Sequence, residues 1–222
     1  MVYILAIETA STKCSVALSK NGENMAIKED KSLNYSHAEM LHQFIEEVLA
    51  QSHLSINDLS AIAVSKGPGS YTGLRIGVSA AKGLCFALDI PLIAISTLEV
   101  LALQVVTSPN TYIVPMLDAR RMEAYTAIYN SNFDLVRDVK AEILDKHSFE
   151  AVLAHQKALF IGSATSKFET VISNANAVFI SDALPSAKDI GRLAFKQFEA
   201  GNTEDVAYFE PFYLKDFVSF KA

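Results

Sequence analysis

The sequence predicts an α/β protein made of two similar halves, and three features of its patterning support that prediction. Short apolar runs alternate with longer segments in which apolar residues recur at helical spacing. Each half begins with three consecutive strands before any helix, which favours an antiparallel meander extended by crossover helices into a mixed sheet. The order βββαβαβα occurs twice without obvious residue-level repetition, so the duplication is one of structure.

The first half opens with a continuous apolar run at residues 3–7, typical of a strand buried on both faces. Residues 14–18 form the next expected strand, and Asn21-Gly22 predicts a hairpin that returns through 25–28. The other elements expected here are a helix over 36–51 with Ser36 and Glu39 as a capping box, a strand over 61–64, a helix over about 72–88, a strand over 91–95 and a helix capped by Ser96 or Thr97.

The second half repeats this order. Its expected elements are strands over 112–117, 124–129 and 135–139, a helix near 149–155, a strand over 159–161, a helix from about 164, a strand over 177–180 and a helix over 187–200 that ends at Gly201-Asn202. The loop around Ser108-Pro109-Asn110 predicts the boundary between the halves. We therefore expect domains at 1–107 and 108–222.

The charge balance argues against a protein that binds nucleic acid on its own. The 222 residues carry 19 Lys and Arg against 25 Asp and Glu, a formal charge of −6, and Arg120-Arg121 is the only adjacent basic pair. Tight binding to phosphates needs a basic face that displaces counterions. Apolar runs are too short to cross a membrane, and two widely spaced cysteines indicate reduced thiols, so we expect a cytoplasmic protein.

Two loops have the general form of phosphate-binding segments. The turn from Glu8 to Thr12 could offer hydroxyls and amides to a phosphate, or it could be an ordinary solvated turn; its lack of glycine favours the second interpretation. Gly67-Pro68-Gly69, which leads into a helix, matches neither nucleotide-binding glycine motif. It could cradle a phosphate or simply connect a strand to a helix.

The helix over 72–88 has an unusually bare stripe. Gly73, Gly77 and Ala81 recur every four residues, and Leu74 and Val78 begin an apolar stripe beside them. A helix that is apolar nearly all round must be covered on more than one side. Either it is enclosed within its domain or one side meets another chain.

The sequence contains no motif for metal-based or nucleophilic catalysis. His37 and His42 are five residues apart and do not share a helix face, and the other histidines are isolated. The sequence has no G-x-S-x-G elbow. The acidic residues Glu8, Asp118 and Glu123 could converge only through the fold.

Several segments together resemble one family. They are residues 4–9 with 15–18, His37-Ala38-Glu39, residues 67–77 with 81–84, residues 117–125 and residues 211–215. This set resembles the bacterial TsaB (YeaZ) branch of the sugar kinase/Hsp70/actin superfold. The resemblance implies a two-lobed, ribonuclease H-like fold with duplicated βββαβαβα halves.

The resemblance also implies a role. Members of this branch are non-catalytic partners of the paralogue TsaD and the ATPase TsaE, which together transfer a threonylcarbamoyl group to the exocyclic amine of the adenosine after the anticodon in certain tRNAs. It implies that tRNA is bound only through the complex, that the isolated chain forms a homodimer, and that no cofactor is tightly bound, although a nucleotide could lie at the interface of the complex. Thr97 and Leu101 stand where the paralogue has metal-binding histidines, and neither residue is an adequate ligand.

The resemblance implies three groups of site residues in this chain. The first is a vestigial phosphate turn of Glu8, Thr9, Ser11 and Thr12. The second is a partner interface of His37, Leu41, Ile45, Val48, Gly73, Gly77, Val78 and Ala81. The third is a pair of signature loops with Gly67, Pro68, Gly69, Tyr71, Thr72, Arg75, Asp118, Arg120 and Arg121. We expect no catalytic and no metal-binding residue, with an ATP-dependent kinase-like or metalloprotease-like enzyme as the alternative.

Overall fold

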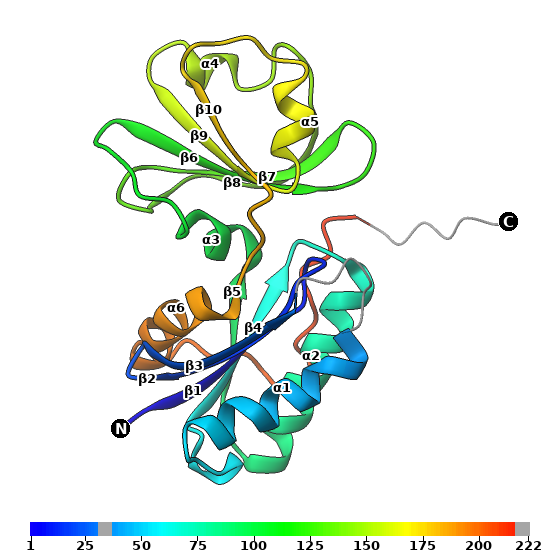
Figure 1. Ribbon diagram of the computed structural model, residues 1–222, viewed down its shortest axis with the longest axis vertical. Helices are drawn as coiled ribbons and strands as arrows, with labels where there is room; N and C mark the ends of the chain where they lie inside the picture. The colour runs from blue at the N-terminus through cyan, green and yellow to red at the C-terminus, as the bar shows by residue number, and fades with distance from the viewer. Residues whose placement is uncertain (31–36, 216–222) are drawn as a thin grey trace, which may run out of the picture. The chain divides into compact units, whose positions relative to one another are not determined.

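The computed structural model describes residues 1–30 and 37–215 and divides them into two compact units (Figure 1). Unit 1 contains Met1–Ser96 together with the chain from Ser186 onward, and unit 2 contains Thr97–Pro185. Each unit is built on its own five-stranded mixed sheet.

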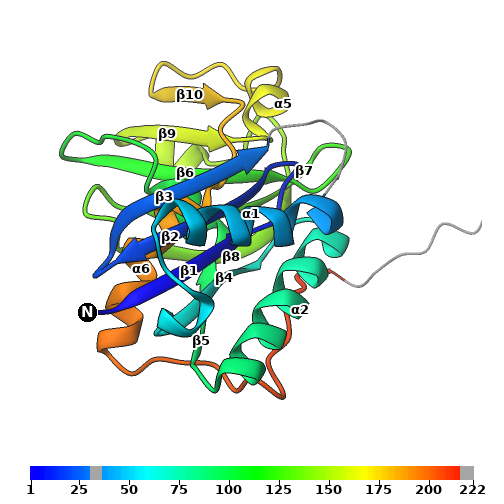
Figure 2. The same cartoon turned by 60° about the horizontal axis from the view of Figure 1, so that its bottom comes forward.

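Unit 1 has the strand order β3-β2-β1-β4-β5. Its elements are β1 (Tyr3–Glu8), β2 (Cys14–Lys20), β3 (Glu23–Asp30), α1 (His37–Gln51), the short 3₁₀ helix η1 (Ile56–Asp58), β4 (Ala61–Gly67), α2 (Tyr71–Leu88), β5 (Leu92–Ser96) and α6 (Ala187–Glu199). The first three strands are antiparallel, whereas β1, β4 and β5 run parallel. Helices α1 and α2 cover one face of the sheet and α6 covers the other (Figures 1 and 2).

Unit 2 has the strand order β10-β9-β6-β7-β8. Its elements are α3 (Thr97–Ala102), β6 (Thr111–Asp118), β7 (Glu123–Tyr129), β8 (Leu135–Ile143), α4 (Glu150–Leu153), β9 (Lys157–Gly162), α5 (Thr165–Glu169) and β10 (Ala177–Ser181). A cluster of aromatic rings fills the face under α4 and α5, where the centroids of Phe160 and Phe168 lie 5.0 Å apart. On the opposite face, Leu98 and Leu101 of α3 pack with Ile113.

The predicted element order is confirmed in both halves, but the predicted division at 107/108 is wrong. The last helix of each half packs on the sheet of the other half: α3 contacts β6 and β7, and α6 contacts β1 and β2. The N–H of Ala187 donates to the Ser15 hydroxyl at 2.8 Å, and Gly191 approaches Ser19, so the start of α6 is joined to β2. Sequence order therefore does not coincide with spatial grouping.

Several element bounds also differ from the predicted ones. Strand β8 extends to Ile143 rather than ending at residue 139, while α4 and α5 are short helices. The predicted cap at Ser36 lies outside the described residues. None of the described helices combines the length and the hydropathy that a membrane crossing needs.

Candidate functional site

The turn between β1 and β2 begins at a fully buried carboxyl group. Glu8 ends β1 and accepts hydrogen bonds from the Ala10 amide, at 2.6 Å, and from the Ser65 hydroxyl of β4. Burial raises the pKa of the Glu8 carboxyl to about 7, although the hydrogen bonds from Ser65 and Ala10 and the charge of Lys13 oppose the rise. Glu8 therefore links β1 to β4, and the pKa of its carboxyl group lies near neutral pH.

This turn is closed by the chain's own glycine loop. The Ser70 amide donates to the Ala10 carbonyl oxygen at 2.7 Å, and the Thr9 hydroxyl donates to the Gly73 carbonyl oxygen at 2.7 Å. A Cβ at Gly69 would lie 2.4 Å from the Ala10 oxygen. The Thr9 hydroxyl and the amides of Ala10 and Ser70, which could have contacted a phosphate at this turn, are therefore bonded within the chain.

The bare stripe of α2 is explained by the same contact. A Cβ built on Gly73 would lie 2.0 Å from the Thr9 carbonyl oxygen, and one on Gly77 would lie 2.3 Å from the Thr9 hydroxyl oxygen. The sequence left open whether this helix is enclosed within its domain or meets another chain. The glycine stripe is enclosed within its own domain. Glycine is needed there because the turn, rather than another chain, approaches the helix backbone.

The predicted partner-interface residues are consequently misassigned. All eight are buried within unit 1: His37, Leu41, Ile45, Val48, Gly73, Gly77, Val78 and Ala81. The apolar side chains among them join the core between α1, α2 and the sheet, and the His37 ring contacts the Ser11 carbonyl oxygen at 2.8 Å. Periodicity identified the apolar faces of both helices correctly, but these faces cover the sheet of unit 1.

The outward side of α2 is more open than its buried stripe. Phe86 is 85% exposed and lies beside Gly83 and Lys82, which line one side of a shallow groove of about 600 Å³. The other side of the groove is formed by residues 205–207 of the C-terminal segment. Sequence patterning did not single out Phe86, because an apolar residue in a mostly apolar helix carries no special signal.

The C-terminal segment is fastened along α2. Lys82 donates to the carbonyl oxygens of Ala207 and Phe209 at 3.1 and 2.8 Å, and the Phe212 amide donates to the Lys66 carbonyl oxygen at 2.7 Å. Tyr213 packs against the Tyr71 ring, at 5.0 Å between centroids.

Much of the first signature loop serves this attachment. Arg75 lies 4.2 Å above the Tyr71 ring and donates to the Tyr213 hydroxyl. Gly67 has a φ of 111°, and a Cβ there would lie 2.8 Å from the Phe212 carbonyl oxygen. Pro68 follows Gly67 in the same turn, whereas Thr72 is exposed on the first turn of α2.

The second signature loop forms the turn between β6 and β7. Arg120 and Arg121 both have left-handed backbones, with φ of 71° and 49°, and both side chains are exposed. Lys167 of α5 donates to Asp118 Oδ1 and to the Arg121 carbonyl oxygen, each at 2.9 Å, and also to the Glu123 carbonyl oxygen. Lys167 is a residue of this site that the sequence analysis missed.

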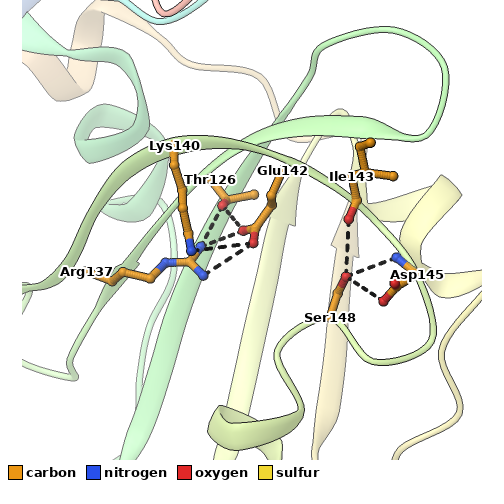
Figure 3. Close-up of polar contacts among 7 residues, drawn as sticks. All are labelled: Thr126, Arg137, Lys140, Glu142, Ile143, Asp145 and Ser148. Atoms are coloured by element: carbon orange, nitrogen blue, oxygen red, sulfur yellow. Dashed lines mark hydrogen bonds and ion pairs between the residues drawn. The ribbon is translucent and has the colours of Figure 1, made fainter.

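A second polar cluster in unit 2 joins the basic side chains of Arg137 and Lys140 to Glu142 (Figure 3). Arg137 of β8 donates to Glu142 Oε1 and to the Thr126 hydroxyl, each at 2.6 Å, and lies 4.9 Å above the Phe149 ring. In the neighbouring turn, Ser148 caps the Asp145 amide. The cluster ties β8 to β7 and to the following loop.

The predicted acidic residues do not gather into one site within either unit. Glu8 belongs to unit 1, whereas Asp118 and Glu123 belong to unit 2 and contact the same lysine. In the described ranges 1–30 and 37–215, no three His, Cys, Asp or Glu side chains are arranged to hold a metal ion. Thr97 and Leu101 are both buried on α3.

The chain has two five-stranded mixed sheets covered by helices, and each half follows the order βββαβαβα. This architecture defines an actin-like, ribonuclease H-like α/β protein. YeaZ from Pseudomonas aeruginosa superposes with a TM-score of 0.82 at 25% identity, covering 96% of this chain and all of that one. A second Pseudomonas aeruginosa structure, described as similar to peptidase YEAZ, gives a TM-score of 0.84 at 26% identity over 97% of this chain and all of that one.

Sequence comparison identifies the family within this class. A family model described as TsaD, tRNA N6-adenosine threonylcarbamoyltransferase, matches residues 31–219. The Escherichia coli tRNA threonylcarbamoyladenosine biosynthesis protein TsaB is 32% identical over 98% of this chain and 96% of its own length. The Bacillus subtilis protein of the same name is 34% identical over 96% of this chain and 93% of its own length. The chain belongs to the TsaB family.

Proposed function

We propose that this chain is a non-catalytic partner subunit of the bacterial complex that transfers a threonylcarbamoyl group to the exocyclic amine of the adenosine after the anticodon in certain tRNAs. The names of its Escherichia coli and Bacillus subtilis relatives support the process. The observation that carries the non-catalytic role is the closed turn after β1: the Ser70 amide is bonded to Ala10, and the Thr9 hydroxyl to Gly73. No kinase-like or protease-like activity is proposed, because that turn is filled by the chain itself.

The partner proposed for this chain is TsaD, with the ATPase TsaE as a third component. A tRNA N6-adenosine threonylcarbamoyltransferase from Staphylococcus haemolyticus is 39% identical over 41% of this chain, which supports a common ancestry of the two subunits. Paralogues that share a fold can form a pseudo-symmetric pair from equivalent surfaces. In the absence of TsaD, a second copy of this chain would take the same place, giving a homodimer in the cytoplasm.

The proposed docking surface remains on α1 and α2, but on their outward sides. Phe86 is a large apolar side chain held almost entirely in solvent, and it borders the groove lined by Gly83 and Val206. Aromatic side chains beside a groove are typical anchors of protein interfaces. The residues expected to contact TsaD therefore differ from the buried set that helical periodicity selected.

Binding of tRNA is assigned to the complex rather than to this chain. A formal charge of −6 gives little counterion release on contact with phosphates. We propose that any nucleotide used by the complex binds at the interface between subunits; the closed β1–β2 turn supports this proposal.

Titration of the purified chain into purified TsaD, followed by calorimetry, tests the proposal. We expect a one-to-one complex, with Phe86→Ala weakening it at least tenfold and leaving the thermal unfolding of the free chain unchanged. Val106→Ala is the matched control, because Val106 is 97% exposed and lies neither on α2 nor along the groove. Failure of the unaltered chain to bind TsaD would overturn the proposed function, whereas full-strength binding by Phe86→Ala would overturn only the docking surface.

A further inference from the structure

The turn between β6 and β7 holds two adjacent arginines in an unfavourable backbone conformation. Both Arg120 and Arg121 have positive φ, a region in which the Cβ of an ordinary residue crowds the backbone. Tight hairpin turns with positive φ at successive positions usually contain Asn and Gly instead. Strained backbone of this kind persists only where surrounding contacts enforce it.

Lys167 supplies the enforcing contact. Its ammonium group has three N–H donors, and each meets an oxygen of the turn: Asp118 Oδ1, the Arg121 carbonyl and the Glu123 carbonyl. The lysine side chain is 16% exposed, so these bonds are largely screened from water.

Asp118 completes the arrangement from the other side. Its Oδ1 accepts from the Arg120 amide at 2.6 Å as well as from Lys167. The Ala119 amide donates to the Glu123 carbonyl oxygen at 3.0 Å, and the Glu123 amide donates to the Arg120 carbonyl oxygen at 3.1 Å. The ammonium therefore joins the two ends and the middle of the turn.

Arg120 and Arg121 are both exposed. Among the residues that the structure describes, no ion pair is formed by Arg120 or Arg121, although the chain as a whole is acidic. Arginine is enriched at protein interfaces, and a pair of exposed cations fits a surface that carries carboxylates.

We infer that Lys167 is a positioning residue: it locks the Asp118–Glu123 turn so that Arg120 and Arg121 project together onto an acidic surface of TsaD. This inference rests on the proposed function, because it needs TsaD as the partner. The Lys167 ammonium group is bonded to oxygens of the turn itself. Its effect on association acts through the conformation of the turn.

The test compares three variants of the full chain. Lys167→Met removes the ammonium while keeping much of the side-chain volume, Lys167→Arg keeps a positive charge and several donors, and Lys157→Met removes an equal charge from an exposed lysine of the same unit. Amide hydrogen exchange of peptides covering 117–125 reports the turn, thermal unfolding reports the fold, and titration into TsaD reports association.

We expect Lys167→Met to exchange at least tenfold faster over 117–125 and to bind TsaD about tenfold more weakly. Lys167→Arg should restore part of the protection from exchange and part of the affinity for TsaD. Lys157→Met should match the parent in both measurements. Lys167→Met should weaken binding no further in an Arg120→Ala, Arg121→Ala background, because the groups that it positions are already absent.

Unchanged exchange in Lys167→Met would overturn the locking of the turn. Faster exchange with undiminished binding to TsaD would overturn the positioning role. If the unaltered chain does not bind TsaD, the proposed function fails and the positioning role fails with it, while the exchange measurement still decides whether Lys167 orders the turn.

Discussion

The hydroxyl group of Thr9 donates a 2.7 Å hydrogen bond to the carbonyl oxygen of Gly73, although the two residues are 64 positions apart. This bond joins the β1–β2 turn to the first turn of α2. The same approach of Thr9 accounts for Gly73 and Gly77 of α2 and for the closure of a turn that resembles a phosphate site in sequence.

Substitution of Gly73 should mainly unfold the chain. In Gly73→Ala, the added Cβ would lie 2.0 Å from the Thr9 carbonyl oxygen, so the turn must move, at a cost of about 2 kcal/mol or more. Gly83→Ala in the same helix is the control, because a Cβ there meets nothing within 4 Å. It should stabilise the helix by about 0.5–1 kcal/mol. Chemical denaturation measures both, and equal stabilities of the two variants would contradict the close approach of the turn.

Glu8 should make the stability of the chain fall as pH rises through neutrality. Its pKa rises from 4.5 to about 7 on folding, so the folded state favours the protonated carboxyl group. The contribution of this group to the free energy of unfolding is greatest below pH 4.5. It declines between pH 4.5 and about pH 7, by about 3 kcal/mol at most. Glu8→Gln mimics the protonated form and should remove this decline.

The measurement is the difference in unfolding free energy between Glu8→Gln and the parent, followed from pH 4 to pH 8. We expect the difference to grow in favour of the variant between pH 4.5 and pH 7 and then to level off. A difference that does not vary with pH would show that Glu8 does not titrate in this range.

Loss of Lys82 should release the C-terminal segment from α2. Lys82→Met removes two hydrogen bonds from an ammonium group to the carbonyl oxygens of Ala207 and Phe209, at a cost of about 1–2 kcal/mol. Limited proteolysis should then cut residues 204–213 faster than in the parent. Lys196→Met changes the same charge on the exposed side of α6 and should leave the cutting rate unchanged.

The isolated chain should bind tRNA weakly. Because its formal charge is −6, contact with tRNA phosphates releases few counterions. A gel-shift titration at about 150 mM salt should show no shift with the chain alone and a shift when TsaD and TsaE are added. Tight, salt-sensitive binding by the chain alone would contradict the assignment of tRNA binding to the complex.

The element order was predictable because strand and helix periodicities are local properties of the sequence. Buried runs such as residues 3–7, the Asn21-Gly22 hairpin and the apolar faces of α1 and α2 were all recognisable without the fold. The Gly/Pro content of residues 67–69 likewise identified the glycine loop, and the family resemblance identified the arginine turn. The same local patterns cannot show what covers an apolar face, and this is why the predicted interface residues proved to be core residues.

The grouping of α3 and α6, the closure of the phosphate-like turn and the role of Lys167 arise from contacts between residues distant in sequence. An amphipathic helix specifies that it must be covered, but any sheet with a complementary apolar face satisfies that need. Gly73 has no room for a side chain because Thr9 lies against it, and the Lys167 ammonium group is largely shielded from water because three oxygens of the β6–β7 turn surround it. Periodicity thus specifies the helices and strands with their apolar faces, whereas packing between distant segments selects the partner of each face, because burial energy depends on apolar area and fit rather than on sequence order.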